Sequence, residues 1–553
     1  MKRIFTLLII TLFVSTSNFA QERYLDEVFT DVTVTSDVEY GVNATVLYFS
    51  AFGEAVPESL VMDIYQPDGD TETNRPVVLV YHTGNFLPNL LNGQISGTKE
   101  DKSAVEICTQ LAKKGYVAAS VTYRKGWNPL ADNQPTRALG LIQAAYRGIQ
   151  DGRNAIRYFR ADADNGNQYG IDPNKIVAWG NGTGGYLTLG LGTLDEYIEI
   201  PQSANGPGKF LLDTDGDGIP ETPMVVPAYH GDINGEVLTI APNDAFGLPA
   251  GDTTNYVNYA GYSSDINMVV NLGGALGDVS WIDENTAPIV SVQSAYDIFA
   301  PYEDAVLVVP TTGDDIVRVQ GGLNIHRALQ AAGNNDIFAD ADFNSTAWAS
   351  DVSAAAEANS ATAGHEYIKT LYPITNAPNS NNLDEGLAIE WWDPNALSPP
   401  IEGFPNGLPW NIVPHPSGGT FHTQGLILNE NMSAEKSIAK ITDYMNFVTP
   451  RMCVVLDLPC KGLFVGTDVK DVVLDASILN ISPNPASTSI NITVKGENIE
   501  SIAIFAMDGK LMTKESNVNS ESITIQRNNL PSGIYFVKAF LERGVATQKV
   551  VFE

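Results

Sequence analysis

Hydrophobic residues follow two different spacings along the chain, and the change of spacing divides the sequence in two. Between about residues 74 and 192, continuous apolar runs such as "PVVLVYH" alternate with stretches in which apolar residues recur every three to four positions. Buried strands that alternate with amphipathic helices are typical of a parallel sheet covered by helices on both faces. The pattern therefore predicts a doubly wound, mostly parallel α/β domain.

Further elements extend this domain in both directions. Residues 28–66 are predicted to form an antiparallel lead-in, and apolar runs at 266–274 and 288–294 are predicted to form two more buried strands. Helices are predicted near 319–333 and 433–448, where the apolar residues again recur at helical spacing.

Two polar insertions, at about 195–262 and 340–420, interrupt this pattern. Insertions of this length in a compact domain usually form lids or binding walls. The second insertion contains Trp391, Trp392 and Trp410. These rings are expected either to pack inside a lid or to face a carbohydrate or polymer ligand.

The last part of the chain has a different character. From residue 478 to 553, short runs alternate strictly between apolar and polar residues, with turn residues between them. This pattern predicts an antiparallel β-sandwich of about 75 residues. We therefore divide the chain into a first domain at 21–466, a linker at 467–477 and a C-terminal module at 478–553.

The first twenty residues are predicted to be a signal peptide. Lys2 and Arg3 precede a short apolar run that ends at Ala20, before polar residues begin. The run is too short to span a bilayer, and no other segment is apolar for long enough to do so. The sequence thus predicts an exported protein with no transmembrane segment.

Charge and cysteine content narrow the possible partners. The chain has 32 Lys and Arg residues against 65 Asp and Glu residues, a formal net charge of −33. Such a surface repels nucleic acid and anionic membranes. Export permits a disulfide between Cys453 and Cys460, which are either paired or free, whereas Cys108 lies in an amphipathic helix and is expected in the core.

The C-terminal module carries a specific resemblance. "SPNPAS", "LPSGIYFVKAF" and the terminal "KVVFE" resemble the C-terminal sorting domain of the Bacteroidetes type IX secretion system. The resemblance implies export through the outer membrane by the type IX machinery, after which the module is cleaved or exchanged for a surface anchor. The alternative is a generic immunoglobulin-like adhesive module.

Residues 60–194 resemble the α/β-hydrolase superfamily, nearest its carboxylesterase and feruloyl-esterase-like branch. "RPVVLVYHTGNF" looks like the strand that leads to the oxyanion loop, and "KIVAWGNGTGGYL" like the strand and helix that form the nucleophile elbow. In the family the bend carries a serine within Gly-x-Ser-x-Gly. Here the bend position is Gly182, which has no side chain, so the nucleophile position is vacant.

Thr183 is the hydroxyl nearest to the vacant position, and it is expected either to act as an unusual nucleophile or to cap and pack the start of the helix. Asp297, in "SAYDIFAPYE", falls where the family carries the acid of its catalytic triad. Its alternative role is an Asx turn at the end of a strand.

The remaining triad and oxyanion positions are also assigned by the resemblance. His422 is the first candidate for the base and His415 the alternate, because both precede the final helix; either could instead be a surface loop residue. The oxyanion donors would be backbone N–H groups near Thr83 and Gly84, together with that of Thr183. A side chain at Thr83 would narrow the oxyanion hole.

A second motif, "LLDTDGDGIPETP", lies in the first insertion. Asp213, Asp215 and Asp217 alternate, Glu221 follows, and the carbonyl of Ile219 is a further possible ligand. Hard oxygen ligands at this spacing are typical of Ca²⁺ loops, although the distal Glu of an EF-hand is missing. The motif predicts a structural Ca²⁺ site, with a merely acidic turn as the alternative.

Three functions remain open at this level. The protein is an inactive or unorthodox member of the carboxylesterase-like group, an active esterase that acts on carbohydrate-linked or small carboxylic esters through Thr183 or other machinery, or a non-catalytic surface protein that binds a polysaccharide or polymer. A purely adhesive protein would explain the C-terminal module but not the hydrolase-like order of elements.

Overall fold

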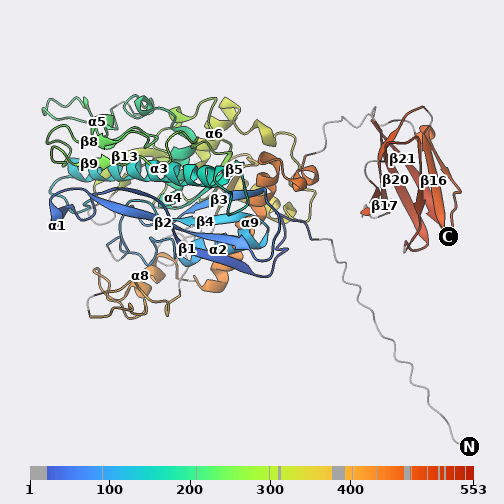
Figure 1. The fold of residues 1–553 in the computed structure, drawn as a ribbon, viewed down its shortest axis with the longest axis horizontal. Coiled ribbons are helices and arrows are strands. Elements are labelled where there is room, and N and C mark those ends of the chain that lie inside the picture. The colour runs from blue at the N-terminus through green and yellow to red at the C-terminus, as the bar shows by residue number, and fades with distance from the viewer. Residues whose placement is uncertain are drawn as a thin grey trace, which may run out of the picture. The chain divides into compact units, whose positions relative to one another are not determined.

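The computed structural model describes residues 21–553 apart from 90, 207, 298, 309–312, 376–392, 402, 431, 466–473, 475, 495, 508–510, 516–517, 529 and 542–543. The predicted signal peptide, Trp391 and Trp392 lie outside the described residues. The chain forms two compact units, of which one ends at Phe464 and the other spans Val465–Glu553. Figure 1 shows both units.

The first unit is built on one eight-stranded mixed sheet, which confirms the predicted α/β class. Its order is β1-β2-β4-β3-β5-β10-β11-β14. The lead-in strands β1 and β2 are antiparallel, and β2 also pairs antiparallel with β4, whereas all other neighbours are parallel. The strands are β1 (Val32–Thr45), β2 (Val56–Pro67), β3 (Arg75–Tyr81), β4 (Val117–Val121), β5 (Ile171–Asn181), β10 (Met268–Leu272), β11 (Ile289–Ser294) and β14 (Leu371–Ile374).

Helices cover both faces of this sheet, as expected for continuous apolar strands. Figure 1 shows α3 and α6 on one side and α2 and α9 on the other, and α2 packs against α9 while α3 packs against α4. The two helices predicted near 319–333 and 433–448 are α6 and α9. The main helices are α2 (Lys102–Lys113), α3 (Gln134–Asp164), α4 (Thr183–Thr193), α6 (Gly322–Ala332), α7 (Ser350–Thr362) and α9 (Ala434–Val455).

Short elements decorate the loops between these helices and strands. The hairpin β12–β13 pairs antiparallel before α6. Two smaller two-stranded sheets, β6–β7 and β8–β9, lie within the first insertion. The short elements are α1 (Phe49–Phe52), β6 (Leu211–Leu212), β7 (Thr222–Pro223), α5 (Pro227–His230), β8 (Thr239–Ile240), β9 (Thr253–Asn255), β12 (Asp304–Val308), β13 (Asp315–Gln320) and α8 (Phe421–Leu428).

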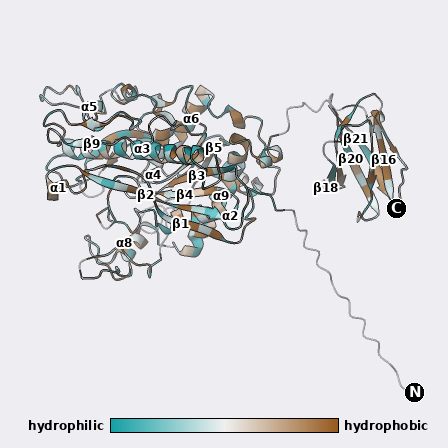
Figure 2. Cartoon of the chain, viewed as in Figure 1, coloured by the Kyte–Doolittle hydropathy of each residue, from teal (hydrophilic) through white to brown (hydrophobic). Residues whose placement is uncertain are grey.

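Helix α3 is unusual because many of its buried residues are polar. Figure 2 shows this helix largely in the hydrophilic colour, although it lies inside the unit. Asp151 on α3 forms a fully buried ion pair with Arg124, at 2.8 Å between Arg124 Nη2 and Asp151 Oδ1. The guanidinium of Arg124 also donates to the carbonyl of Ala44 and to Gln150 Oε1. These bonds join the ends of β1 and β4 to α3.

The same helix anchors the first insertion. Gln150 Nε2 donates to the carbonyls of His230 and Asp232, both at 2.8 Å, and the Tyr146 hydroxyl donates to the carbonyl of Gly231 at 2.9 Å. These bonds satisfy buried backbone groups of a segment with little regular structure. The insertion at 195–262 therefore lies along α3, and none of its described residues lines the pocket described below.

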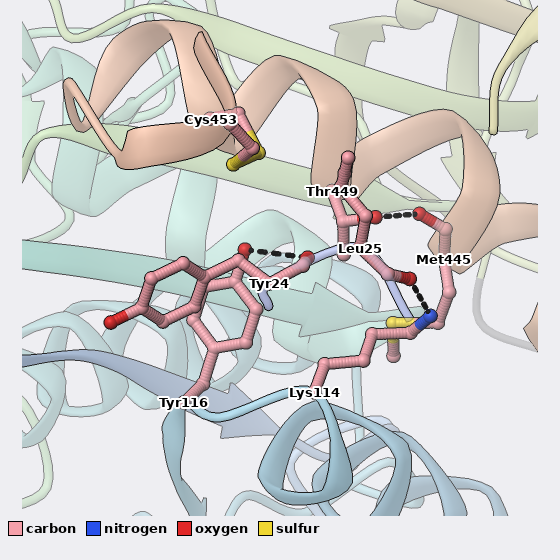
Figure 3. Close-up of a disulfide and its surroundings, with 8 residues drawn as sticks. Tyr24, Leu25, Lys114, Tyr116, Met445, Thr449 and Cys453 are labelled. Carbon is pink, nitrogen blue, oxygen red and sulfur yellow. Dashed lines mark hydrogen bonds between the residues drawn. A yellow bond between two sulfur atoms is a disulfide. The ribbon is translucent and has the colours of Figure 1, made fainter. Parts of the chain in front are cut away.

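The N-terminal segment and the end of α9 lie close together, as Figure 3 shows. Cys453 is joined to Cys460, with a Cα–Cα distance of 5.5 Å, so the open question of this pair is settled as a disulfide. Beside it, the Tyr116 hydroxyl donates to the carbonyl of Tyr24 at 3.2 Å. Cys108 is fully buried, as predicted.

The second unit is the predicted antiparallel β-sandwich. One sheet has the order β15-β16-β19 and the other β18-β17-β20-β21, with every pairing antiparallel. Ile490, Ile504 and Val537 are among the fully buried residues between the sheets. The strands are β15 (Leu479–Ser482), β16 (Ser489–Val494), β17 (Ile499–Ala506), β18 (Leu511–Glu515), β19 (Ser522–Gln526), β20 (Gly533–Leu541) and β21 (Gly544–Phe552).

Among the described residues, no helix combines the length and the apolar character needed to cross a membrane.

The buried Arg124–Asp151 pair gives a stability prediction. Asp151→Ala leaves the guanidinium of Arg124 buried and without its counter-ion, so we expect the free energy of unfolding to fall by about 3–5 kcal/mol. Urea denaturation of the full chain measures the change. The control is Glu27→Ala, which removes the exposed pair between Glu27 and Lys113 at 3.4 Å and should cost less than about 1 kcal/mol. Equal losses in the two variants would contradict the structural role of the buried pair.

Candidate functional site

The bend between β5 and α4 has the backbone geometry of a nucleophile elbow. Gly182 lies between the two elements with φ 52° and ψ −111°, a conformation that strains any residue with a side chain. The flanking glycines are required by close packing. A Cβ atom at Gly184 would lie 2.1 Å from the carbonyl oxygen of Tyr81, and one at Gly180 would lie 2.1 Å from the carbonyl oxygen of Gly184.

The space beside Gly182 is occupied by Thr83. A Cβ atom built on Gly182 would lie 2.4 Å from Thr83 Oγ1 and 3.0 Å from Thr83 Cβ. The Thr83 hydroxyl also accepts a long hydrogen bond, 3.4 Å, from the backbone N–H of Thr183. A serine at position 182 would therefore meet the side chain of Thr83, which lies where the serine's first atoms would be.

The side chain of Thr183 is engaged as well. Its hydroxyl accepts a 2.7 Å hydrogen bond from the backbone N–H of Asn85, in the loop that the resemblance assigns to the oxyanion hole. The N–H of Thr183, one of the predicted oxyanion donors, thus donates to the hydroxyl of Thr83. The N–H of Asn85, which follows the predicted donors in the same loop, donates to the hydroxyl of Thr183. Gly84, with φ 124°, is held close to Gly97, since a Cβ there would lie 2.7 Å from Gly97 Cα.

His82 supports this loop from beneath. Its ring stacks on that of Tyr123 at 4.5 Å, and its Nδ1 donates to the carbonyl of Thr83 at 2.5 Å. Burial lowers the pKa of His82 to about 3. The ring is therefore neutral near pH 7, which suits a packing role.

Asp297 lies in the loop after β11, close to the elbow's neighbouring strand. Its Oδ1 accepts backbone N–H bonds from Phe299 at 2.7 Å and Ala300 at 3.0 Å, which is an Asx-type turn. Its Oδ2 lies 3.5 Å from the position that a Cβ on Gly273 would take. Gly273 and Phe299 both line the pocket below, so Asp297 sits behind the pocket wall.

The structure does not bring either candidate base to this carboxylate. His415 donates through Nε2 to the carbonyl of Gly93 at 3.1 Å and accepts through Nδ1 from the N–H of Ser417 at 3.0 Å. His422 is the second residue of α8. Its Nδ1 is buried and has no hydrogen-bond partner among the described residues. Among the described residues, no hydrogen bond joins His415 or His422 to Asp297.

A pocket of about 500 Å³ opens at the elbow. Its wall combines the elbow itself, the segment at 94–103 that leads into α2, and part of the second insertion. Trp410 belongs to this wall, and it is 4% exposed and packs on Phe421 with ring centroids 5.2 Å apart. The insertion predicted at 340–420 was too long, because it includes α7 and the central-sheet strand β14. The part that follows β14 supplies Asp393, Ala396, Leu397, Ser398, Pro399 and Trp410 to the pocket wall.

The sequence pattern does not identify two further polar residues of the pocket wall. Asn181 accepts from Trp179 Nε1 at 3.1 Å, which fixes its amide so that the buried Nδ2 is left without a partner. Asp101 is bound by the N–H groups of Gly97 and Thr98, while burial raises the pKa of its carboxyl to about 7. In the sequence, Asn181 is the variable residue of the elbow motif and Asp101 looks like an ordinary helix cap.

The acidic motif of the first insertion forms a compact loop between β6 and β7. One carboxylate oxygen each from Asp213, Asp215, Asp217 and Glu221 lies within 4.8 Å of the others, and all four side chains are exposed. Asp213 accepts N–H bonds from Gly216 at 2.7 Å and Gly218 at 2.8 Å. A hydrogen bond from the Thr214 side chain lowers the pKa of Glu221. The loop therefore brings four carboxylate groups together, as a cation site requires.

Comparisons with known proteins match both units of the chain. Residues 62–210 match the family described as BD-FAE. Residues 480–553 match the family described as the secretion system C-terminal sorting domain. No curated protein matches the chain.

Solved structures show similarity at low identity. One is a truncated carbohydrate esterase from gut microbiota, 17% identical, covering 56% of this chain and 87% of that chain with a TM-score of 0.28. Another is a butyrate-bound thermophilic esterase from the Planctomycetes species Thermogutta terrifontis, 16% identical, covering 50% and 76% with a TM-score of 0.28.

The two matched families fall on the two units that the fold separates, and the sorting domain at the C-terminus marks the protein for type IX export to the cell surface or the medium. The chain thus combines an esterase-like α/β-hydrolase domain of the BD-FAE type with a type IX secretion sorting domain.

Proposed function

We propose that this exported protein binds a ligand at its esterase-like site without hydrolysing it through an acyl-enzyme. The observation that carries the proposal is the position of Thr83, whose Oγ1 lies 2.4 Å from where a side chain on Gly182 would begin. Position 182 therefore offers no side chain that could act as the nucleophile. The space that such a side chain would enter is occupied by Thr83. Covalent ester hydrolysis needs a hydroxyl at that bend and a base that activates it.

The oxyanion hole supports the same proposal. A hole stabilises the reaction only if its N–H groups are free to bind the developing oxyanion. Here the N–H of Thr183 is directed to Thr83 Oγ1 and the N–H of Asn85 to Thr183 Oγ1. An incoming carbonyl oxygen would have to displace both threonine hydroxyls.

An active esterase that uses Thr183 is the second candidate, favoured by the position of its hydroxyl one residue beyond the bend. That hydroxyl, however, accepts a 2.7 Å bond from Asn85, and the side chain is 7% exposed. Neither His415 nor His422 lines the pocket. Thr183 is better suited to hold the loop at 83–85 against α4 than to attack an ester.

The pocket favours a small neutral ligand with several hydrogen-bonding groups, such as a sugar or an ester-bearing glycan. Amide and hydroxyl side chains dominate the polar part of its wall, and Trp410 adds an aromatic ring. Amides and aromatic rings together suit ligands that present both hydroxyls and apolar faces. The net charge of −33 disfavours nucleic acid as a ligand.

The first prediction from this proposal concerns the elbow. We expect no hydrolysis of p-nitrophenyl acetate or of a feruloyl ester above the buffer rate by the wild-type chain. Gly182→Ser should lower the free energy of unfolding by about 1–3 kcal/mol because of its backbone strain, with a further loss from the contact with Thr83. Combining it with Thr83→Gly removes that contact, so a double-mutant cycle should give a coupling of about 0.5–3 kcal/mol.

Thr183→Ala is the matched variant for the alternative function. Wild-type hydrolysis that disappears in Thr183→Ala, while folding measured by urea denaturation is retained, would overturn the proposal. A coupling energy near zero between positions 83 and 182 would show that Thr83 does not occupy the vacant position.

We also propose that the loop at Asp213–Glu221 binds a structural Ca²⁺, with Asp213, Asp215, Asp217 and Glu221 as ligands and the carbonyl of Ile219 as a further candidate. The support is the convergence of four carboxylates within 4.8 Å on a hairpin loop. Carboxylates this close repel one another, and a divalent cation removes that repulsion. The ion would brace the first insertion.

The calcium proposal predicts one binding event per chain in a calorimetric titration with CaCl₂ near pH 7. At about one hundred times the dissociation constant, Ca²⁺ should stabilise the first unit by about 2.7 kcal/mol. Asp215→Asn with Asp217→Asn should abolish both effects. The charge-matched control Asp351→Asn with Glu357→Gln removes two exposed carboxylates of α7 and should change neither. Equal binding by wild type and the Asp215/Asp217 variant would contradict the site.

A further inference from the structure

The two faces of the C-terminal sandwich differ in chemistry. In the sheet β15-β16-β19, the residues that alternate with the buried core are neutral and polar. They are Asn480, Ser482, Ser489, Asn491, Thr493, Ser522, Thr524 and Gln526. A face of short polar side chains is suited to contact with water, and nothing in its composition favours burial against another surface.

The other sheet presents an apolar and basic face. The strand pairing places Phe505 beside Phe536, and Ile534 beside Val551, on the side away from the core. Ile534 and Phe536 are 38% and 39% exposed. We call this surface the β20 face (Figure 1). Its outward residues are Ser501, Phe505, Lys514, Ile534, Phe536, Lys538, Phe540, Thr547, Lys549 and Val551. Ala503 and Val545 lie on the same side but are buried.

Lysines surround the aromatic residues of the β20 face. Lys514 pairs with Ala503 at one edge, and Lys549 pairs with Phe536 toward the other. Lys538 Nζ lies 5.0 Å from the ring centroid of Phe540. Among the described residues paired across these four strands, the outward positions include no aspartate or glutamate, although Glu500 and Glu515 are exposed elsewhere on β17 and β18.

The charge of this module also differs from that of the rest of the chain. Residues 480–553 contain seven Lys and Arg and seven Asp and Glu, so their formal charge is zero, whereas the whole chain carries −33. All of the net negative charge therefore lies before residue 480. An acidic surface would repel the first unit but not the sorting domain, and the lysines of the β20 face would be drawn to it.

We propose that the β20 face is the surface by which the sorting domain docks on a protein of the export machinery, and that the partner presents an apolar centre with an acidic rim. Exposed aromatic rings bordered by charged residues are typical of protein interfaces, in which the rings supply most of the affinity and the charges supply orientation. The opposite face of the same sandwich has neither feature.

An anionic membrane is a weaker occupant of this face than a protein. Lysines would be attracted to acidic lipid headgroups, but the excess negative charge that precedes the module would be repelled by the same surface. A localised acidic rim on a protein attracts the lysines of the β20 face without presenting an extended anionic surface to the rest of the chain. The occupant is thus a protein with a small, complementary patch.

The test is export of the full chain from a bacterium with an active type IX system. Lys514→Glu with Lys549→Glu should lower the ratio of exported to periplasmic protein by at least about tenfold, and Phe536→Ser should lower it as well. Lys514→Arg with Lys549→Arg keeps the charge and should export like wild type. The matched control places four Glu residues on the opposite face, at positions 480, 491, 524 and 526, which gives the same total change of charge and should leave export unchanged.

Folding and lipid binding are measured on the same variants. Thermal unfolding of the purified full chain identifies any variant whose sandwich is lost, and the Lys-to-Arg pair shows whether charge or side-chain shape matters. Normal export of the folded Lys514→Glu/Lys549→Glu chain would overturn the proposal, and so would an equal loss in the opposite-face control. Binding to phosphatidylglycerol vesicles that depends on the two lysines, with export unaffected, would instead assign the face to a membrane.

Discussion

The close approach of helix α4 to the central sheet is the constraint on which the site depends. A Cβ atom at Gly184 would lie 2.1 Å from the carbonyl oxygen of Tyr81, and one at Gly185 would lie 2.5 Å from Asn271 Oδ1. Only glycine fits such gaps, because close-packed interiors leave no room for a shift of the backbone. The bend at Gly182 is therefore imposed by packing between α4 and its neighbouring strands, independently of any chemistry at the bend.

This constraint accounts for the shape of the bend at Gly182. Once position 182 has no side chain, the space beside it is available to the loop that follows β3, and Thr83 fills it. The N–H groups of Thr183 and Asn85 then bind protein hydroxyls at 3.4 Å and 2.7 Å. Each of these two N–H groups is bound by a threonine hydroxyl. The two bonds therefore stabilise the loop that follows β3.

The sequence was sufficient for the α/β class of the first unit, the bend at Gly182 and the terminal sandwich, because each follows from local spacing or a short motif. It was not sufficient for Thr83, whose contact with the bend joins residues about one hundred positions apart. The first insertion was expected to form a lid or wall, but it lies along α3. Gln150 and Tyr146, which hold it there, look in sequence like the solvated side of a helix. The triad assignments of Asp297, His415 and His422 stay predictions.

The pocket combines parts of the chain that lie far apart in the sequence, the elbow at 181–183 and the segment at 393–410. The wall contributed by the second insertion includes Trp410 and would contact a ligand in the pocket. Contacts of this kind bind ground state and transition state equally, so they support affinity without catalysis. In the binding function proposed above, the glycine at position 182 leaves such contacts in place. Under the proposed function, the pocket wall would therefore support binding without turnover.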